Sequence, residues 1–587
     1  MRGRLLLLVV IGGLSFSNSL GGPFHYDDLH SVQYNPHIRS LSWIPTFYVD
    51  PSTFSGQVRG FMYRPLLLTT FASDYALWGQ NATAFRVGNL AIHIAAAAAF
   101  GVLSYLLLRS TLAATVISLI FLVHPLHGEV VNYISARSDS LVALLFVVCC
   151  ICALKGRSHA VGIGYAASLM VKSVAITLGP MFVMLRGWGG AVTATKSKFM
   201  AGAVVLLSIG YLAMLWSTRF LSHSAEVFPR APTQEMWTQV KGLVYYVWLF
   251  ASPIRLSVDH PFSVGAATDP AVIMAITVVL SAVGLSWRHR LSVPGLAAIW
   301  YGVAILPYVF LPLNVLVAER RAYLAMAGGM LLAGWAWHRL YERRRSQACY
   351  IGMSLLVCLV VLTMQRNQVW ASGIGLWSDA VEKNQTSARA QVNLSLALRR
   401  AGRADSARRH LREGLRLDPE FAEGWVIAGD MAKDLGEWDT ARSAYERAAQ
   451  IQPAMEGVHH NLGNLAYAEG RVDDAIRAFR RTLELNPRFA EARNNLGQAL
   501  EARGQDEEAL AEYEQAVQHA EFWIHTDDPV GGAWYNLARI ADRLDRPSQA
   551  IDAYRQTIQH LQGGDEYSRF VEFARKRVVS LADGGAR

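Results

Sequence analysis

The sequence predicts an all-α protein, in which a polytopic helical membrane domain precedes a solenoid of stacked helical hairpins. Hydrophobic residues make up 52% of the 587 residues and charged residues 17%, against roughly a quarter charged in an ordinary soluble domain. Apolar runs with charges at their ends continue to about Met364, whereas Arg, Glu, Asp and Ala dominate from Gln365 onward. Composition and its change along the chain therefore predict a membrane domain followed by a soluble one.

The net charge of +9 favours an orientation signal over nucleic-acid binding. Many basic residues stand beside apolar runs, and basic loops set the direction of membrane insertion. We therefore expect the lipid bilayer as a partner and no nucleic acid. All five cysteines lie inside apolar runs and no CxxC pair accompanies a second one, so no structural zinc site is predicted.

Eleven membrane crossings are predicted, because a bilayer core of about 30 Å needs roughly 20 apolar residues per helix. Residues 1–20 form the first span, with a cytoplasmic N-terminus; a signal peptide is the alternative. Region 158–187 could hold two short or broken helices. Basic loops fall on the inside only if segment 240–256 is re-entrant or interfacial. The remaining spans are 84–108, 111–125, 139–154, 158–172, 174–187, 199–217, 269–287, 294–312, 322–339 and 348–364.

A repeat begins near residue 388. Pro419, Pro453 and Pro487 are 34 residues apart, and the same period links four glycines and four alanines. This period, with Gly between two helices and Pro at the end, is the tetratricopeptide signature. Each unit is a helical hairpin that buries its apolar face by stacking on its neighbours. Five units begin near Ala388, Ala422, Glu456, Ala490 and Gly531, the last after an insertion containing FWIHTDDPVGG.

Four parts of the chain follow from these patterns. They are a membrane domain at 1–364 with a first outer loop at 21–83, a linker helix region at 365–387, repeats at 388–562, and a C-terminal helix or tail at 563–587. The count of crossings places the outer loop and the repeats on the same side. The Arg- and Ala-rich repeats suggest a bacterial inner membrane with both parts periplasmic. An endoplasmic-reticulum membrane with lumenal repeats is the alternative.

Two adjacent carboxylates, Asp27 and Asp28, follow the first span in the stretch PFHYDDLHSVQYNP. Ionisable residues beside a bilayer are costly and often functional. Neighbouring side chains point about 100° apart on a helix and to opposite faces of a strand, so the two carboxylates are expected to differ in role. One can accept a proton from an attacking hydroxyl, while the other orients a neighbour. The alternative is a helix cap without chemistry.

Basic residues expected at the same outer surface indicate an anionic ligand. In HPLHGEVVNYISARSDSL, the spacing of His124 and His127 suits a shared metal or phosphate, and Arg137 is a natural phosphate ligand. Positive charge on the outside runs against the orientation rule, and a lipid phosphate would explain it. The alternatives are interfacial capping and, near Arg320 and Arg321, pairing with Glu319.

The ordered motifs resemble the transmembrane and tetratricopeptide-repeat O-mannosyltransferases, members of the GT-C glycosyltransferases. These motifs are YDD with a later Asn, YRPL, HPLHGEVVNYISARSD, a Lys in a broken helix pair, ERRAYL, QRNQVW and the repeats. The resemblance covers nearly the whole chain. Two departures stand out. Lys172–Ser173 occupies the place of the usual Lys-Glu, which leaves Lys172 without its expected partner, and Glu129–Val130 replaces Glu-Ala.

The resemblance implies an inverting transfer of a mannose-like sugar from a polyprenyl-phosphate donor to a protein hydroxyl, outside the cytoplasm. Asp27 or Asp28 would be the base, with Asp27 favoured as the first of the pair. No cofactor is firmly predicted; a divalent metal is compatible but not required, because arginines can neutralise the phosphate. The residues assigned to the lipid phosphate are Arg64, Arg137, Arg320, Arg321, His124, His127 and Lys172.

An asparagine recurs at the sixth position of four units, where the first helix lines the concave surface. An amide both donates and accepts, so a ladder of asparagines can bind an extended peptide backbone. This resembles the groove of nucleocytoplasmic O-linked N-acetylglucosamine transferases. The alternative is that Asn simply favours stable repeats. The residues are Asn393, Asn461, Asn495 and Asn536, and the second unit has Ile427 instead.

The principal prediction is therefore a membrane glycosyltransferase whose partners are a polyprenyl-phosphate sugar and a protein acceptor. Two alternatives stay open: transfer to a lipid or surface glycan, and a non-catalytic membrane scaffold whose repeats recruit partners. The sequence indicates neither the sugar nor the acceptor.

Overall fold

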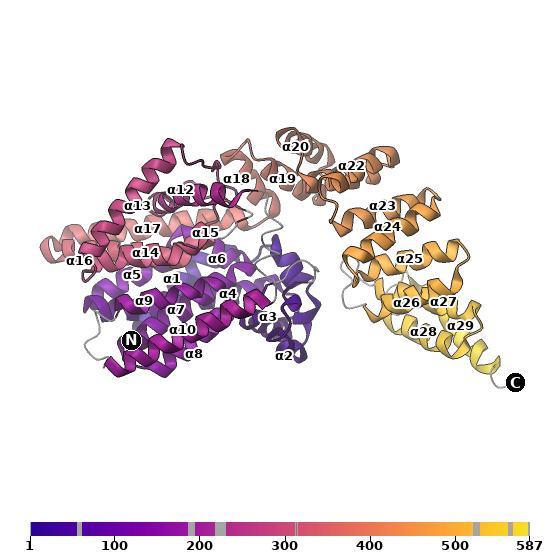
Figure 1. Ribbon diagram of the computed structural model, residues 1–587, viewed down its shortest axis with the longest axis horizontal. Coiled ribbons are helices and arrows are strands. Elements are labelled where there is room, and N and C mark those ends of the chain that lie inside the picture. The colour runs from indigo at the N-terminus through magenta and orange to yellow at the C-terminus, as the bar shows by residue number, and fades with distance from the viewer. Residues whose placement is uncertain are drawn as a thin grey trace. The chain divides into compact units, whose positions relative to one another are not determined.

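The computed structural model describes residues 2–55, 62–185, 194–217, 230–310, 313, 315–519, 529–561 and 567–584. Most of the insertion expected before the fifth repeat lies outside these residues. Every long element in the described part of the chain is a helix (Figure 1), so the all-α prediction is confirmed. The chain divides into two compact units, Met1–Ala397 and Leu398–Arg587.

The first unit contains the apolar helices. Its helices are α1 (Arg2–Phe16), α2 (Ile44–Phe47), α3 (Pro65–Trp78), α4 (Ala82–Leu108), α5 (Thr111–Val123), α6 (Gly128–Asn132), α7 (Arg137–Leu154), α8 (Ser158–Leu169), α9 (Leu178–Leu185), α10 (Ala194–Ser217), α12 (Pro232–Ala251), α13 (Pro270–Arg288), α14 (Val293–Ile305), α15 (Pro307–Phe310), α16 (Glu319–Arg343), α17 (Arg345–Trp370) and α18 (Gly373–Lys383). Helix α19 (Ala388–Arg400) crosses the boundary between the units.

Five described helices are long and apolar enough to cross a membrane: Ala82–Leu108, Ile134–Leu154, Pro270–Arg288, Val293–Phe310 and Arg345–Trp370. A sixth span results if Thr111–Val123 and Pro125–Asn132, bent by 53°, count as one. The count of eleven stays a prediction. The segments around residues 3–19, 173–182 and 201–216 form shorter apolar helices.

Helix α16 is absent from that set because its apolar character is weak, yet it is central to the first unit. Its residues from Ala322 to Ala327 are buried, and it packs against α14 and α5. A Cβ at Gly328 would stand 2.3 Å from the Ala297 carbonyl oxygen, and one at Gly334 would stand 2.0 Å from Ile117. Small residues thus permit close helix contacts, and protein covers the first half of this helix.

The second unit is a solenoid of helical hairpins (Figure 1). Gly402, Gly436, Gly470 and Gly504 all have φ between +73° and +80°, the left-handed conformation that favours glycine at a helix end. The 34-residue period therefore corresponds to one hairpin. The helices are α20 (Ala404–Leu417), α21 (Ala422–Asp434), α22 (Trp438–Ile451), α23 (Glu456–Ala468), α24 (Val472–Leu485), α25 (Ala490–Ala502), α26 (Asp506–Gln518), α27 (Pro529–Arg543), α28 (Pro547–Leu561) and α29 (Ser568–Gly584).

Candidate active site

Asp28 anchors the loop that follows α1. Its side chain is buried and accepts four hydrogen bonds: from the His25 N–H (3.1 Å), the Ile134 N–H (3.3 Å), and the Ser135 N–H and hydroxyl (2.7 Å each). Burial raises its pKa to about 6, although the bonds from Ser135 and His25 and the charge of Arg86 act in the opposite direction. Asp28 therefore ties the loop to residues 134–135.

Asp27 has a different environment. Its side chain is 57% exposed, and its Oδ1 lies 3.5 Å from His30 Nε2. Burial of the surrounding site would raise its pKa, but the hydrogen bond and charge of His30, the charge of Arg320 and a hydrogen bond from Tyr133 hold it well below its usual range. The carboxylate is therefore ionised and accessible, as a proton acceptor must be. The two aspartates therefore have different environments, and the difference in role stays a prediction.

The backbone just before the pair is unusual. Tyr26 has φ +47°, a conformation that non-glycine residues adopt at a cost of order 1–3 kcal/mol, often at functional sites. Its ring packs edge-on against Tyr133, with centroids 5.8 Å apart, and against Trp377 of α18, 5.0 Å apart. Helix α18 thus helps to hold the conformation that exposes Asp27.

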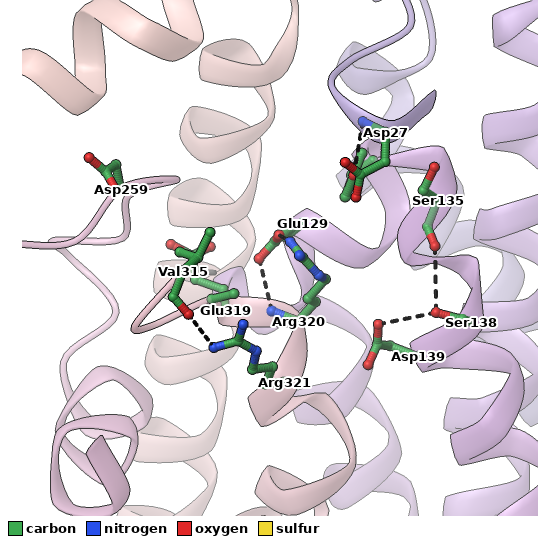
Figure 2. A network of polar contacts seen from close by, with 12 residues as sticks. Asp27, Glu129, Ser135, Ser138, Asp139, Asp259, Val315, Glu319, Arg320 and Arg321 are labelled. Carbon is green, nitrogen blue, oxygen red and sulfur yellow. Dashed lines mark hydrogen bonds and ion pairs between the residues drawn. The ribbon is translucent and has the colours of Figure 1, made fainter. Parts of the chain in front are cut away.

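Arg320 lies beside Asp27. Its backbone N–H and its guanidinium donate to the two oxygens of Glu129, at 2.8 and 2.5 Å, and its guanidinium stands 5.4 Å from the centre of the Tyr133 ring. Figure 2 shows Asp27, the Glu129–Arg320 pair and Asp139 in one region. Glu129 neutralises the charge of Arg320, and two further cationic side chains lie in the same region.

Lys172 and Arg64 are those cations. Lys172 Nζ pairs with Asp139 Oδ1 at 2.5 Å, so Asp139 provides the partner that Ser173 cannot. Arg64 precedes α3 and stands 5.4 Å from the centre of the Phe54 ring, without an ion pair to any carboxylate in the described residues. The charges of Asp139 and Arg320 both act on Arg64. Arg64, Lys172 and Arg320 therefore form one cluster, which we call the cationic cluster.

Arg137 contacts protein groups on three sides, and its assignment to the lipid phosphate stays a prediction. It is 1% exposed and donates to Asn89 Oδ1 (2.6 Å) and the Phe85 carbonyl (2.8 Å), while pairing with Asp74 at 2.6 Å. Its guanidinium also covers the Phe71 ring at 4.8 Å. With its donors occupied by α3 and α4, Arg137 fixes the start of α7.

The other residues assigned to phosphate contact backbone carbonyls. His124 bonds to the Phe250 oxygen (3.1 Å) and His127 to the Phe121 oxygen (2.9 Å). Arg321 donates to the Val315 oxygen at 2.6 Å, away from Arg320 (Figure 2). Glu319 pairs with Arg366 at 3.1 Å instead of with its neighbours. Across the described residues, no group of three or more His, Cys, Asp or Glu converges as metal ligands would.

Several supporting residues were not assigned from the sequence. Arg86, buried in α4, donates to the carbonyls of Gly22 and Pro23 and so holds the start of the loop. Asn367 of the QRNQVW motif accepts from Asn132 at 2.9 Å and donates to the Ser15 carbonyl at 2.9 Å. A charged residue inside an apolar helix was the available signal for Arg86. The pairing of Asn367 has no local signature.

In the second unit, a groove of about 880 Å³ contains three of the four predicted asparagines. Asn495 donates to Asn464 (2.8 Å), Asn536 to Asn494 (2.9 Å) and Asn461 to Asp430 (3.4 Å). Asn393 lies in the first unit and donates to the Arg389 carbonyl at 2.8 Å. Mutual hydrogen bonds thus orient the amides of the groove before any ligand binds.

Comparisons with known proteins agree with both parts of the chain. Tetratricopeptide-repeat family models match residues 367–456, 460–523 and 531–559. The Caenorhabditis elegans protein O-mannosyl-transferase F38B6.6 is 23% identical over 72% of this chain and 63% of its own length. The chain resembles the protein O-mannosyltransferases. Other relatives are Drosophila melanogaster Tmtc3, 22% identical over 78% of this chain and 60% of its own, and human TMTC1, 23% identical over 74% and 57%.

This chain spans about 60% of the length of those O-mannosyltransferase relatives. Among solved structures, YrrB, a TPR protein with an unusual peptide-binding site, matches 34% of this chain and 97% of its own at 20% identity and a TM-score of 0.28. The apolar helices and the O-mannosyltransferase relatives together make this chain a multi-pass membrane protein with tetratricopeptide repeats.

Proposed function

We propose that the protein is a GT-C-type glycosyltransferase that transfers a mannose-like sugar from a polyprenyl-phosphate donor to hydroxyls of protein acceptors on the extracytoplasmic side. The observation that carries the proposal is the exposed, ionised Asp27 beside the cationic cluster. The O-mannosyltransferase relatives support the same chemistry. Arg320 and Lys172 are paired with Glu129 and Asp139, whereas Arg64 has no ion pair in the described residues. A base next to these three cations suits a reaction in which a hydroxyl loses a proton while a phosphate departs.

In this mechanism the acceptor oxygen attacks the anomeric carbon in a single displacement, which inverts its configuration. Asp27 takes the hydroxyl proton as the new bond forms. The bond to the lipid phosphate breaks, and Arg64, Arg320 and Lys172 stabilise the negative charge that develops on that phosphate. Such preorganised electrostatic stabilisation is usually the largest catalytic contribution. Asp28 acts by keeping the loop in place.

The acceptor would lie as an extended peptide along the groove of the second unit. Asn461, Asn495 and Asn536 line it, and amides can bind a peptide backbone without regard to its sequence. Replacing the three with alanine should raise the KM for a peptide acceptor while leaving donor hydrolysis unchanged. Equal loss of both activities would argue against the groove as the acceptor site.

The decisive experiment compares Asp27→Asn with Asp28→Asn in purified, reconstituted protein supplied with radiolabelled polyprenyl-phosphate mannose and a peptide acceptor. Asp27→Asn should keep the Tm and lower kcat by about 10²–10⁴-fold, as expected for loss of a general base. Asp28→Asn should also lower kcat, because its amide would direct a donor at backbone N–H groups and displace the loop, and the fall in its activity below about pH 6 should disappear. Normal transfer by a folded Asp27→Asn variant would refute the mechanism.

The same assay separates the alternatives. Transfer to a lipid or glycan but to no peptide would favour the glycan enzyme. Absence of transfer from any polyprenyl-phosphate sugar, in protein that still binds peptides, would favour the scaffold.

A further inference from the structure

The first repeat carries a concentrated positive charge on its exposed surface. Between residues 400 and 416 there are six arginines and two carboxylates. All six arginine side chains are exposed. They are Arg400, Arg403, Arg408, Arg409, Arg412 and Arg416, which we call the arginine surface.

The arginines are only partly neutralised. Arg408 pairs with Asp405 and Arg416 with Glu413, each at 2.7 Å. The other four form no ion pair with a carboxylate in the described residues, and Arg412 donates only to the Arg408 carbonyl. Exposed pairs of this kind contribute little energy and exchange readily with other anions. The surface therefore keeps most of its positive potential.

The charge lies on one exposed stripe of α20. Arg408, Arg412 and Arg416 are spaced by four residues, which places them on the same helical face. The opposite face of α20 packs through the buried Ala407 and Leu411. A straight row of guanidinium groups on a helix is able to lie along a flat anionic surface.

Among the described second helices, α20 alone has more basic than acidic residues, since α22 and α28 carry equal numbers of the two. Helix α24 balances Arg477, Arg480 and Arg481 with three acidic residues, whereas α26 has five acidic residues and no basic one. The C-terminal helix α29 has a similar excess of basic residues, but Lys576 and Arg577 are paired with Glu572 and Asp542. The groove of about 880 Å³ is lined by residues of later helices and by none from α20, so the arginine surface is separate from the acceptor groove.

Chain connectivity keeps this surface close to a bilayer. The last apolar helix ends at Trp370 and α20 begins at Ala404. The intervening chain holds the short helices α18 and α19, so the start of α20 lies at most roughly 70 Å, and Arg416 at most roughly 90 Å, from the end of the span. Tethering at this length gives a high effective concentration of lipid headgroups, which a soluble acidic partner would not have.

We propose that the arginine surface docks on anionic lipid headgroups of the membrane in which the protein resides. Each arginine near an anionic bilayer adds to the attraction, and the attraction decays within a Debye length. Docking would hold the first repeat at the membrane surface. This inference does not depend on the proposed transferase activity.

Hydrogen exchange of the full chain in nanodiscs tests the proposal. We expect the amides of α20 to exchange about tenfold more slowly in discs containing phosphatidylglycerol than in phosphatidylcholine discs, and this protection to disappear in about 1 M salt. The triple variant Arg408→Glu, Arg412→Glu and Arg416→Glu should lose the protection. Its glutamine counterpart should lose most of it with normal helical content by circular dichroism.

The matched control reverses three exposed arginines of α24, with Arg477→Glu, Arg480→Glu and Arg481→Glu, and should retain the protection of α20. Equal exchange of α20 in the two kinds of disc would overturn the proposal. So would protection that persists in the α20 glutamate variant. Protection by soluble polyglutamate in phosphatidylcholine discs, without protection by phosphatidylglycerol, would assign the surface to an acidic polypeptide and also overturn it.

Discussion

At the scale of single residues, Asp27 and Asp28 show how environment separates two identical side chains. Four donors surround Asp28, whereas Asp27 faces solvent, His30 and Arg320. Adjacency in the sequence was enough to predict different roles. It could not predict which aspartate was buried, because the donors at Ile134 and Ser135 come from a segment more than a hundred residues away.

The pH dependence should report on Asp28, since Asp27 stays ionised near neutral pH. With a pKa of about 6, Asp28 loses its charge below that pH, and a protonated carboxyl cannot accept all four hydrogen bonds. Activity should therefore fall below about pH 6. Ser135→Ala removes a bond that favours the charged form, so the acid limb of kcat/KM should move to higher pH. An unchanged limb would contradict this assignment.

Stability has the opposite pH dependence at this residue. The folded-state pKa of Asp28, about 6, lies above the ordinary value of 3.8, so the folded protein binds more protons between these values. The stabilisation from this carboxyl is complete below pH 3.8 and is lost as the pH rises through 6. Asp28 is therefore maintained in its charged form at some cost to stability.

Arg137 tests whether an arginine in the expected sequence motif is enough to assign a phosphate ligand. Lysine cannot reproduce its fork of contacts to Asn89, Phe85 and Asp74. Arg137→Lys should thus reduce the free energy of unfolding by about 3 kcal/mol, measured as a lower Tm, with the donor KM unchanged. Arg64→Gln should show the reverse, a lower kcat/KM for the donor at nearly constant Tm. A raised KM at constant Tm in Arg137→Lys would restore the phosphate role.

At the scale of elements, local patterns predicted what local interactions determine. The period of 34 located the first four hairpins, because the turn glycines and the helix packing repeat with the sequence. Span prediction was less complete. The first half of helix α16 is covered by protein, and the helix as a whole has little apolar character. His124 interrupts the 111–125 run where α5 ends and the chain bends by 53°. Such features depend on neighbours that hydropathy does not record.

The first helices of the repeats contain glycines that allow close packing within a hairpin. A Cβ at Gly497 would stand 2.7 Å from the Tyr513 ring, whereas one at Gly457 would meet nothing within 4 Å. Gly497→Ala should therefore destabilise the solenoid by about 1–3 kcal/mol in urea unfolding. Gly457→Ala is the control and should stabilise it by up to about 1 kcal/mol, because alanine favours the helix. Equal effects would mean that Tyr513 moves aside.

At the scale of the whole molecule, the proposed reaction requires the loop of Asp27 and the repeats to be on the same side of the membrane. The predicted eleven crossings satisfy this requirement. The first takes the chain from the cytoplasm to the side of Asp27, and the ten that follow end on that same side before the repeats. An even number of crossings after α1 is then needed between Asp27 and residue 388. The basic stretch at residues 343–345 must lie on the opposite side, as the orientation rule predicts.

Cysteine labelling in spheroplasts measures this arrangement. In a variant without the five native cysteines, single cysteines at the exposed positions Ser42, Glu437 and Arg344 report on the outer loop, the repeats and the basic stretch. A membrane-impermeant maleimide should label Ser42→Cys and Glu437→Cys in intact spheroplasts, and Arg344→Cys only after permeabilisation. Labelling of Ser42→Cys without Glu437→Cys would place the groove and Asp27 on opposite sides, and the acceptor could not then pass from one to the other.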